Sequence, residues 1–343
     1  MRRPVDLRSD TVTRPTAAMM TAMMEAELGD DVFEDDPTIL RLERLGAERV
    51  GQEAGLFMAS GTMGNQAAIM THTRRGHEVL VGRPCHIQEH EVGAAAVLSG
   101  VSLVPLDAPT GMLSADEVER AIRTPDIHHP ETGLLCLECA HSSGAVQPLE
   151  SLRAVIDVAR GHQVPVHLDG ARIFNAAHAL GVTAAEVGRG VDSVMYCLSK
   201  GLGAPIGSLL CGSREFIARA RRSRKSLGGG MRQVGLLGAA GLHALEHHVE
   251  RLVEDHARAD RLAAGLAEVA SITICENRRH INMVWFKHEY QGDPLRLVDA
   301  MLERQVKIFR PLGGEWRLVT HLDVDDEGLE YAIEQLRDVF GNA

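Results

Sequence analysis

The sequence predicts an α/β protein in which a mainly parallel sheet lies between helices and a small α+β domain follows at the C-terminal end. Two observations support this prediction. Over the first two thirds of the 343 residues, short apolar runs bounded by turn residues alternate with segments of helical periodicity, which is the pattern of parallel strands connected by helices. After a long helical stretch, the apolar runs become shorter and the pattern is that of a smaller mixed domain.

The expected strands of the large domain are apolar runs that end in turn residues. Pro165 stands inside one of them, and because proline lacks the N–H that a central strand needs, we place it at or near the first residue. The strands cover residues 55–59, 78–81, 101–105, 134–138, 164–169, 191–196 and 208–211. The helices between them cover residues 62–72, 90–98, 114–123, 149–160 and 213–226.

The domain boundaries follow from the same pattern. We assign residues 1–232 to the large domain with an N-terminal arm, 233–270 to a connecting helix and 271–343 to the small domain. The small domain is expected to contain strands at 272–275, 282–286 and 316–321 and helices at 295–304 and 326–340.

Composition excludes several functional classes. A net charge of −11 argues against a nucleic-acid partner, since phosphate binding requires a clustered basic face. The short basic segment 219–225 is interpreted as a solvated helix face or a local anion site. No apolar run reaches the roughly 18 residues of a membrane-spanning helix, and the first residues do not resemble a secretory signal. We therefore expect a cytoplasmic protein without a membrane partner.

The six cysteines do not form a disulfide framework in a chain of this length. Cys136 and Cys139 spell C-x-x-C, but no second pair follows, and an odd separation on a strand turns the two thiols to opposite faces. Structural packing is favoured over zinc, and no metal site is expected.

Unusual residues follow several of the predicted strands, at the sheet edge where open parallel sheets bind ligands. Gly61 and Thr62 open a helix and form either an anion site or an ordinary helix cap. Asp169 ends a buried strand, so its carboxylate requires a cation or strong donors. Arg172 and a protonated ligand nitrogen would serve equally well as its partner.

A lysine and a histidine complete the set. Lys200 emerges from an apolar strand into a glycine-rich turn, where it is either an exposed loop residue or, if partly desolvated, a Schiff-base nucleophile. His86 is a core residue, a loop residue or a ring that stacks on a ligand. Together with the anion site and the buried carboxylate, these residues match the requirements of pyridoxal 5′-phosphate.

Long strings in the chain are similar to those of one enzyme family. They are "DLRSDTVTRPT" from Asp6, "GDDV" from Gly29, "DDPT" from Asp35, "SGTMGNQ" from Ser60, "HLDGARIFNA" from His167, "LSKGLGAPIGSLL" from Leu198, "GGGMRQ" from Gly228 and "RLVTHLDV" from Arg317. In these strings the chain resembles the low-specificity L-threonine aldolases, which are fold-type I pyridoxal-phosphate enzymes. The resemblance covers nearly the whole chain. It implies cleavage of L-threonine, L-allo-threonine and related L-β-hydroxy-α-amino acids to glycine and an aldehyde.

The resemblance also implies a role for each site residue. Lys200 would hold the aldehyde of the cofactor, Asp169 its pyridine nitrogen, and His86 would stack on its ring. Gly61 and Thr62 would bind the phosphate, which Arg232 would reach from a neighbouring subunit. The substrate carboxylate would be bound by Ser9, Arg172 and Arg317. Arg172 would also lie near the cofactor. His128 is expected near the substrate hydroxyl.

Two further expectations concern the base and the assembly. His86, His128 or a water held between them would remove the proton of the β-hydroxyl. The chain would form a homotetramer, a dimer of dimers whose active sites are shared between subunits, with a small amino acid as substrate.

The chain departs from the family strings at a few positions. Phe33 and Glu34 replace a tyrosine and a glycine, Gln88 replaces a tyrosine, and "ECAHSSG" from Glu138 replaces an asparagine-rich run. These positions lie where substrate and subunit contacts are expected, so they bear on side-chain preference more than on the cofactor.

Rival hypotheses stay open at this point. They are a β-eliminating lyase or a transaldolase on the same scaffold, and a regulatory domain that binds the cofactor without catalysis. The last requires an attached DNA-binding module, for which we expect no room before Asp6 or after His321.

Overall fold

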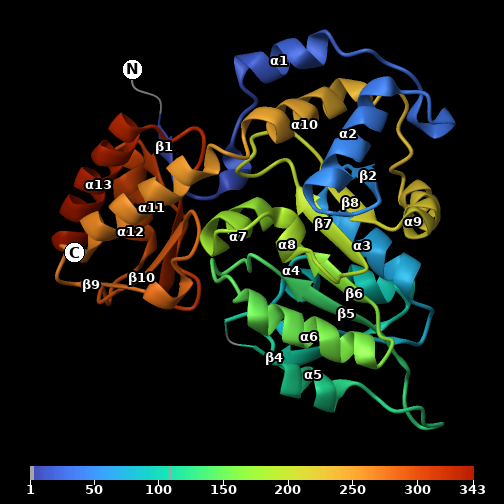
Figure 1. Cartoon of the computed structure of the whole chain (residues 1–343). Helices are drawn as coiled ribbons and strands as arrows, with labels where there is room; N and C mark the ends of the chain where they lie inside the picture. Colours follow the sequence, from blue (N-terminus) through green and yellow to red (C-terminus); the bar gives the residue numbers. More distant parts are fainter. Residues whose placement is uncertain (1–3, 109) are drawn as a thin grey trace.

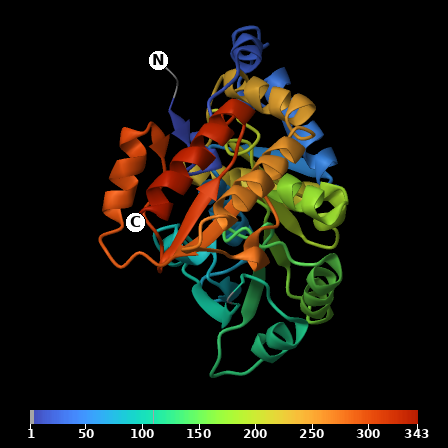
Figure 2. The same cartoon turned by 90° about the vertical axis from the view of Figure 1, so that its left-hand side faces the viewer.

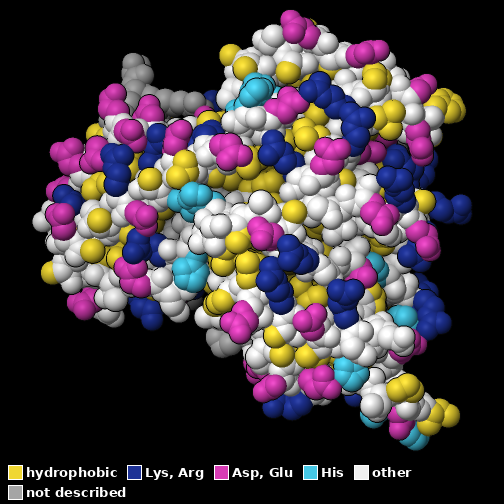
Figure 3. Space-filling model, viewed as in Figure 1, with side chains coloured by type: hydrophobic (Ala, Val, Ile, Leu, Met, Phe, Trp, Pro, Cys, Tyr) yellow, Lys and Arg dark blue, Asp and Glu magenta, His cyan; other side chains and the backbone are white. Residues whose placement is uncertain are grey.

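The computed structural model describes residues 4–108 and 110–343. Figure 1 shows a large lobe built around the central sheet and a small lobe formed by the C-terminal segments. None of the helices in these residues is long and apolar enough to cross a membrane. On the face shown in Figure 3, basic and acidic side chains are interspersed.

The large lobe contains a seven-stranded sheet in the order β2-β8-β7-β6-β5-β3-β4. All neighbouring pairs from β7 to β4 are parallel, whereas β8 runs antiparallel to both β7 and β2. The predicted fold class is thereby confirmed. Pro165 lies directly before its strand, as the missing N–H requires. The strands are β2 (Ala54–Met58), β3 (Glu78–Arg83), β4 (Ser102–Asp107), β5 (Thr132–Glu138), β6 (Val166–Asp169), β7 (Ser193–Cys197) and β8 (Ser208–Gly212).

Helices cover both faces of this sheet (Figure 1). Neighbouring strand residues point to opposite faces, so Met195 packs in the core under α3 and α9 while Val194 and Tyr196 pack in the core on the other side. The helices of this lobe are α1 (Ala17–Met24), α2 (Pro37–Arg49), α3 (Gly61–His72), α4 (His86–Glu89), α5 (Ala115–Ala121), α6 (Leu149–Gly161), α7 (Ile173–Leu180), α8 (Ala184–Val187), α9 (Arg214–Ser226) and α10 (Gly235–His247), with short turns η1 (Asp10–Val12), η2 (Asp31–Phe33) and η3 (Ala95–Ser99).

The small lobe has a three-stranded antiparallel sheet in the order β12-β10-β9. Figure 2, in which this lobe faces the viewer, shows α11 and α13 side by side. The elements are α11 (Leu252–Ala267), β9 (Ile272–Ile274), η4 (Glu276–Arg278), β10 (Met283–His288), α12 (Leu295–Glu303), β11 (Val306–Lys307), β12 (Glu315–Val319) and α13 (Asp326–Gly341).

The N-terminal arm belongs to both lobes. Its first strand, β1 (Val5–Asp6), pairs in parallel with β11 of the small lobe, and the following residues cross to the large lobe. The sequence prediction places the arm in the large domain alone, because a two-residue strand has no periodic signal.

The predicted connecting helix at 233–270 is two helices. Two of its glycines let α10 approach α2 closely, since an added Cβ on Gly238 would lie 2.7 Å from Ile39. By contrast, α11 packs in the core of the small lobe together with α13. The segment breaks at 248–251 because its two halves bury their apolar faces against different lobes.

The helix predicted at 90–98 forms only in its second half, as the π-helical turn η3. It is separated from the preceding α4 by Val92 and Gly93, which have φ of 55° and 67°. Two successive residues in the left-handed region cannot continue a right-handed helix.

The basic segment of α9 is partly a solvated face, since Arg219, Arg222 and Lys225 are exposed. The other two arginines pair within the chain: Arg224 is buried and lies 2.5 Å from Asp31, and Arg221 contacts Glu43 at 3.1 Å. These two pairs tie α9 to η2 and α2.

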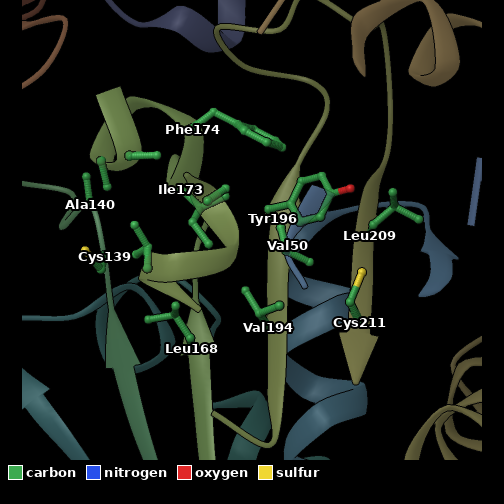
Figure 4. Packing of buried hydrophobic residues seen from close by; sticks show 14 of the residues in the cluster. Val50, Cys139, Ala140, Leu168, Ile173, Phe174, Val194, Tyr196, Leu209 and Cys211 are labelled. Atoms are coloured by element: carbon green, nitrogen blue, oxygen red, sulfur yellow. The ribbon is translucent and has the colours of Figure 1, made fainter. Parts of the chain in front are cut away.

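Close packing of α2 on the sheet depends on one glycine. The Tyr196 hydroxyl donates to the Gly46 carbonyl at 3.0 Å, and an added Cβ on Gly46 would lie 2.2 Å from Cδ1 of Leu209. Figure 4 shows Tyr196 and Leu209 on neighbouring strands of this core.

We expect Gly46→Val to lower the free energy of unfolding by about 1–3 kcal/mol or more, because α2 must move off the sheet. The matched control is Gly161→Ala at the end of α6, where an added Cβ meets no atom within 4 Å. Chemical denaturation followed by circular dichroism measures both. Equal stability of Gly46→Val and the wild type would contradict this packing.

Candidate active site

A cavity of about 300 Å³ lies at the carboxyl ends of the parallel strands. The strand ends, the start of α3 and the N-terminal arm all contribute to its wall. Most of the predicted site residues line it, namely Gly61, Thr62, His86, Asp169, Arg172 and Lys200. The sheet order brings them together, since β5, β6 and β7 are neighbours.

The start of α3 can hold an anion. Ser60 caps the helix by accepting from the Met63 amide at 3.1 Å, whereas the amides of Gly61 and Thr62 make no hydrogen bond with the described residues. An added Cβ on Gly61 would lie 3.1 Å from Sγ of Cys197, so a larger residue would crowd the cavity wall. Ser60 is therefore the helix cap, and the free amides are available to an anion such as a phosphate.

Asp169 is buried at the end of β6 and forms no ion pair with a lysine or arginine of the described chain. Its Oδ1 accepts from the Ala171 amide at 3.0 Å and its Oδ2 from Nδ2 of Asn65 at 2.7 Å. Burial and the neighbouring Glu138 carboxylate together raise the pKa of Asp169 to about 6. A cationic ligand nitrogen would complete this environment.

The backbone around Lys200 is fixed by the glycine-rich turn and the N-terminal arm. The Lys200 carbonyl accepts from the Thr13 hydroxyl at 2.9 Å and from the Gly203 amide at 2.9 Å. Gly203 has φ of 77°, and an added Cβ would lie 2.9 Å from Leu322. The ammonium lines the cavity and makes no hydrogen bond or ion pair with the residues that the structure describes.

Two buried carboxylates fix His86. Its backbone N–H donates to Oε2 of Glu138 at 2.9 Å, and its Nδ1 lies 2.8 Å from Oε1 of Glu91. The hydrogen bond to Glu91 raises the pKa of His86. Because Nδ1 is engaged in this way, Nε2 is the ring atom left for a ligand.

Neither carboxylate was singled out from the sequence. Glu138 carries a recognisable signal, since it ends an apolar strand beside Asp169, with which it is in register. Glu91 carries none, because "HIQEHE" contains two glutamates and nothing in the string shows which one is buried.

Arg172, one of the residues predicted to bind the substrate carboxylate, pairs with a carboxylate of the chain itself. Nε and Nη2 of Arg172 donate to Asp10 at 2.7 and 2.6 Å. The sequence predicts Asp169 or a substrate carboxylate as the partner of Arg172, and it does not predict Asp10. Burial alone would raise the pKa of Asp10, but the Arg172 guanidinium holds it well below its usual range.

Arg317 is the less satisfied of the two arginines. Its Nε is buried and has no hydrogen-bond partner among the described residues. Burial, followed by repulsion from Arg172, lowers the pKa of Arg317. A substrate carboxylate would relieve both effects. Ser9 is buried nearby in the arm, where its hydroxyl caps η1 by accepting from the Thr11 amide at 3.2 Å.

Besides Ser9 and Arg317, which do not line the cavity, two further predicted residues lie outside it in their own chain. His128 is in an exposed loop before β5, at the edge opposite the cavity, where its amide donates to Asp126 at 2.8 Å. The expectation that His128 joins this site is therefore not met within one chain. Arg232 is exposed and lies 3.3 Å from Asp30. Of the positions that depart from the family strings, Ser142 lines the cavity and Phe33 is exposed.

Comparison with known proteins gives a consistent result. A sequence model of the beta-eliminating lyase family matches residues 6–289. The chain is 45% identical to a low specificity L-threonine aldolase of Escherichia coli K12, over 95% of this chain and 96% of that protein. It is 42% identical to low-specificity L-threonine aldolase 1 of Arabidopsis thaliana, over 96% and 95%. Its fold matches a threonine aldolase structure from Leishmania major with a TM-score of 0.83 at 21% identity, covering 98% and 100%.

The Glu91 contact leads to a prediction for His86. In Glu91→Gln the imidazolium loses its carboxylate partner, so the pKa of His86 should fall from its raised position toward or below the ordinary 6.5. NMR titration of the histidine rings measures this shift, with the curve of His128 as an internal reference that should coincide in both proteins. An unmoved His86 curve would show that Glu91 does not set its protonation.

Proposed function

Since the chain belongs to the beta-eliminating lyase family and, within it, to the low-specificity L-threonine aldolases, we propose that it cleaves L-threonine with pyridoxal 5′-phosphate as cofactor. The substrates are L-threonine, L-allo-threonine and related L-β-hydroxy-α-amino acids, and the products are glycine and an aldehyde. The enzyme is thus a carbon–carbon lyase.

The observation that supports this proposal most strongly is the buried Asp169 carboxylate without a lysine or arginine partner in the described chain. A protonated pyridine nitrogen would supply the missing cation. The other residues that line the cavity also suit this cofactor. The free amides of Gly61 and Thr62 suit its phosphate, Lys200 suits its aldehyde, and His86 suits its ring face. When bound, the cofactor accepts the electron pair released as the Cα–Cβ bond of the substrate breaks.

The chain's own residues orient the substrate. Arg317 and Arg172 bind the substrate carboxylate, and Asp10 holds Arg172 in place through its two hydrogen bonds. Fixing this end of the substrate sets which bond at Cα faces the ring, and correct alignment lowers the barrier to cleavage.

His86 is the residue that transfers the proton of the β-hydroxyl. It is the predicted histidine that lies in the cavity of the same chain, and Glu91 keeps the proton on Nδ1. Nε2 can then take the proton of the β-hydroxyl, directly or through a water, as the aldehyde carbonyl forms. The same atom can return a proton after cleavage.

A second activity is favoured by the description of the matching family, which is that of β-eliminating lyases. Elimination would release ammonia and a 2-oxo acid, whereas a transaldolase would pass the glycyl fragment to another aldehyde. Product analysis separates these reactions from aldol cleavage.

We also propose a homotetramer, arranged as a dimer of dimers. The large apolar side chains of Val92, Ile127 and Met24 are 97%, 95% and 81% exposed in one chain, and contacts with further copies would bury them. A neighbouring subunit would also bring Arg232 to a phosphate site. The six free cysteines fit a reducing compartment, and we propose the cytoplasm.

Purified protein should convert L-threonine to glycine and acetaldehyde and show a cofactor absorbance band. Lys200→Ala should abolish both, because it removes the amine that holds the cofactor. The matched control is Lys287→Ala on β10, a lysine whose side chain is 65% exposed, which should keep both. Cleavage at the wild-type rate by Lys200→Ala would exclude the assignment, and ammonia with a 2-oxo acid would favour elimination.

Light scattering after size exclusion should give four times the 37.2 kDa of one chain. Ile127→Asp and Val92→Asp should lower this mass if these side chains lie at contacts between copies, because a buried unpaired carboxylate is unfavourable. A wild-type protein that elutes as a monomer would contradict the proposed assembly.

A further inference from the structure

Asn65 lies between two buried carboxylates of the candidate site. Its Nδ2 donates to Oδ2 of Asp169 at 2.7 Å and to Oε1 of Glu91 at 2.8 Å. All three side chains are at most 2% exposed. A carboxylate oxygen of Glu91 and one of Asp169 lie within 4.8 Å of each other, with His86 in the same cluster.

Hydrogen bonds on the side away from the two carboxylates fix the orientation of the Asn65 amide. Its Oδ1 lies 3.1 Å from Nε2 of His167, whose Nδ1 is 2.8 Å from Oγ of Ser193. The same hydroxyl lies 2.8 Å from Nε2 of His72. Burial lowers the pKa of His167 to about 3, so the ring is neutral and carries one N–H, which the amide oxygen accepts. Both hydrogens of the Asn65 amide therefore point at the carboxylates.

Two buried carboxylates near each other repel, which disfavours the charged form. A neutral group that donates to both reduces this tendency. An amide is suited to the role, since it offers two N–H groups and adds no charge.

We propose that Asn65 is a positioning residue that bridges Asp169 and Glu91 and keeps Asp169 ionised beside the second carboxylate. Asp169 can then pair with a protonated ring nitrogen while Glu91 holds His86. This inference rests on the proposed function, because it assigns the two carboxylates to different parts of one bound cofactor and its catalytic base.

Several other groups act on the Asp169 carboxylate. Glu138 on β5 opposes its ionisation, whereas Lys200 and His86 favour it. The thiols of Cys85 and Cys136 also face it, and burial raises the pKa of both, so they stay neutral. Loss of the Asn65 donor leaves all of these in place. Asp169 should then take up a proton at a higher pH than in the wild type, and cofactor affinity should fall as the pH is lowered through that range.

The test is the dissociation constant of pyridoxal 5′-phosphate from the protein, measured by equilibrium dialysis across a pH series. Asn65→Leu should weaken binding roughly tenfold to a hundredfold at the acidic end, the effect of losing a hydrogen bond to a charged group. The loss should shrink as the pH rises. The matched control is Gln66→Leu on the same helix, which removes a donor at 2.6 Å from Glu91 and none from Asp169. The change that Gln66→Leu causes in the dissociation constant of the cofactor should be equal at every pH.

A second pair of variants guards against misfolding. His167→Gln keeps an N–H donor toward the amide and should bind like the wild type, whereas His167→Leu should shift in the direction of Asn65→Leu. Circular dichroism and thermal melting confirm that each protein is folded. A loss in Asn65→Leu that is the same at every pH, or no loss, overturns the inference while the wild type still binds and cleaves. A wild type that binds no cofactor overturns the proposed function instead.

Discussion

The burial of one carboxylate, Asp169, is the constraint on which the site depends. A charge at the end of a central strand loses its hydration and must gain donors or a cation. The described chain supplies two donors, Asn65 and the Ala171 amide, but no lysine or arginine that forms an ion pair with Asp169. Arg172, three residues on, is turned away to Asp10. The sheet order then places Glu138 and Lys200 at the ends of the neighbouring strands, so that charges of both signs meet in one cavity.

The features predicted from the sequence were those with a local signal. Apolar runs marked the strands to within a few residues, and Asp169 and Lys200 were visible as polar residues where such runs end. Contacts between distant segments could not be predicted in this way. Asp10 meets Arg172 across 162 positions and Asn65 meets Asp169 across 104, and neither pairing leaves a periodic trace. Glu91 was missed for the same reason.

Other misses had a conformational origin. Val92 and Gly93 adopt positive φ and end a segment that otherwise has helical periodicity. The long helical stretch after 233 divides because α10 and α11 serve different cores. In the second case tertiary packing decided against a pattern that was locally sound.

The N-terminal arm joins parts of the chain that are made at very different times. Residue 5 pairs with residue 306, and the Leu7 carbonyl accepts from the Val319 amide at 2.9 Å. The same arm carries Asp10 to Arg172 and Thr13 to the Lys200 carbonyl. During synthesis residues 5 and 6 have no β partner until residues 306 and 307 have left the ribosome. Contacts of such long sequence separation form slowly, so the wall that the arm gives to the cavity is completed last, after the sheet beneath it has folded.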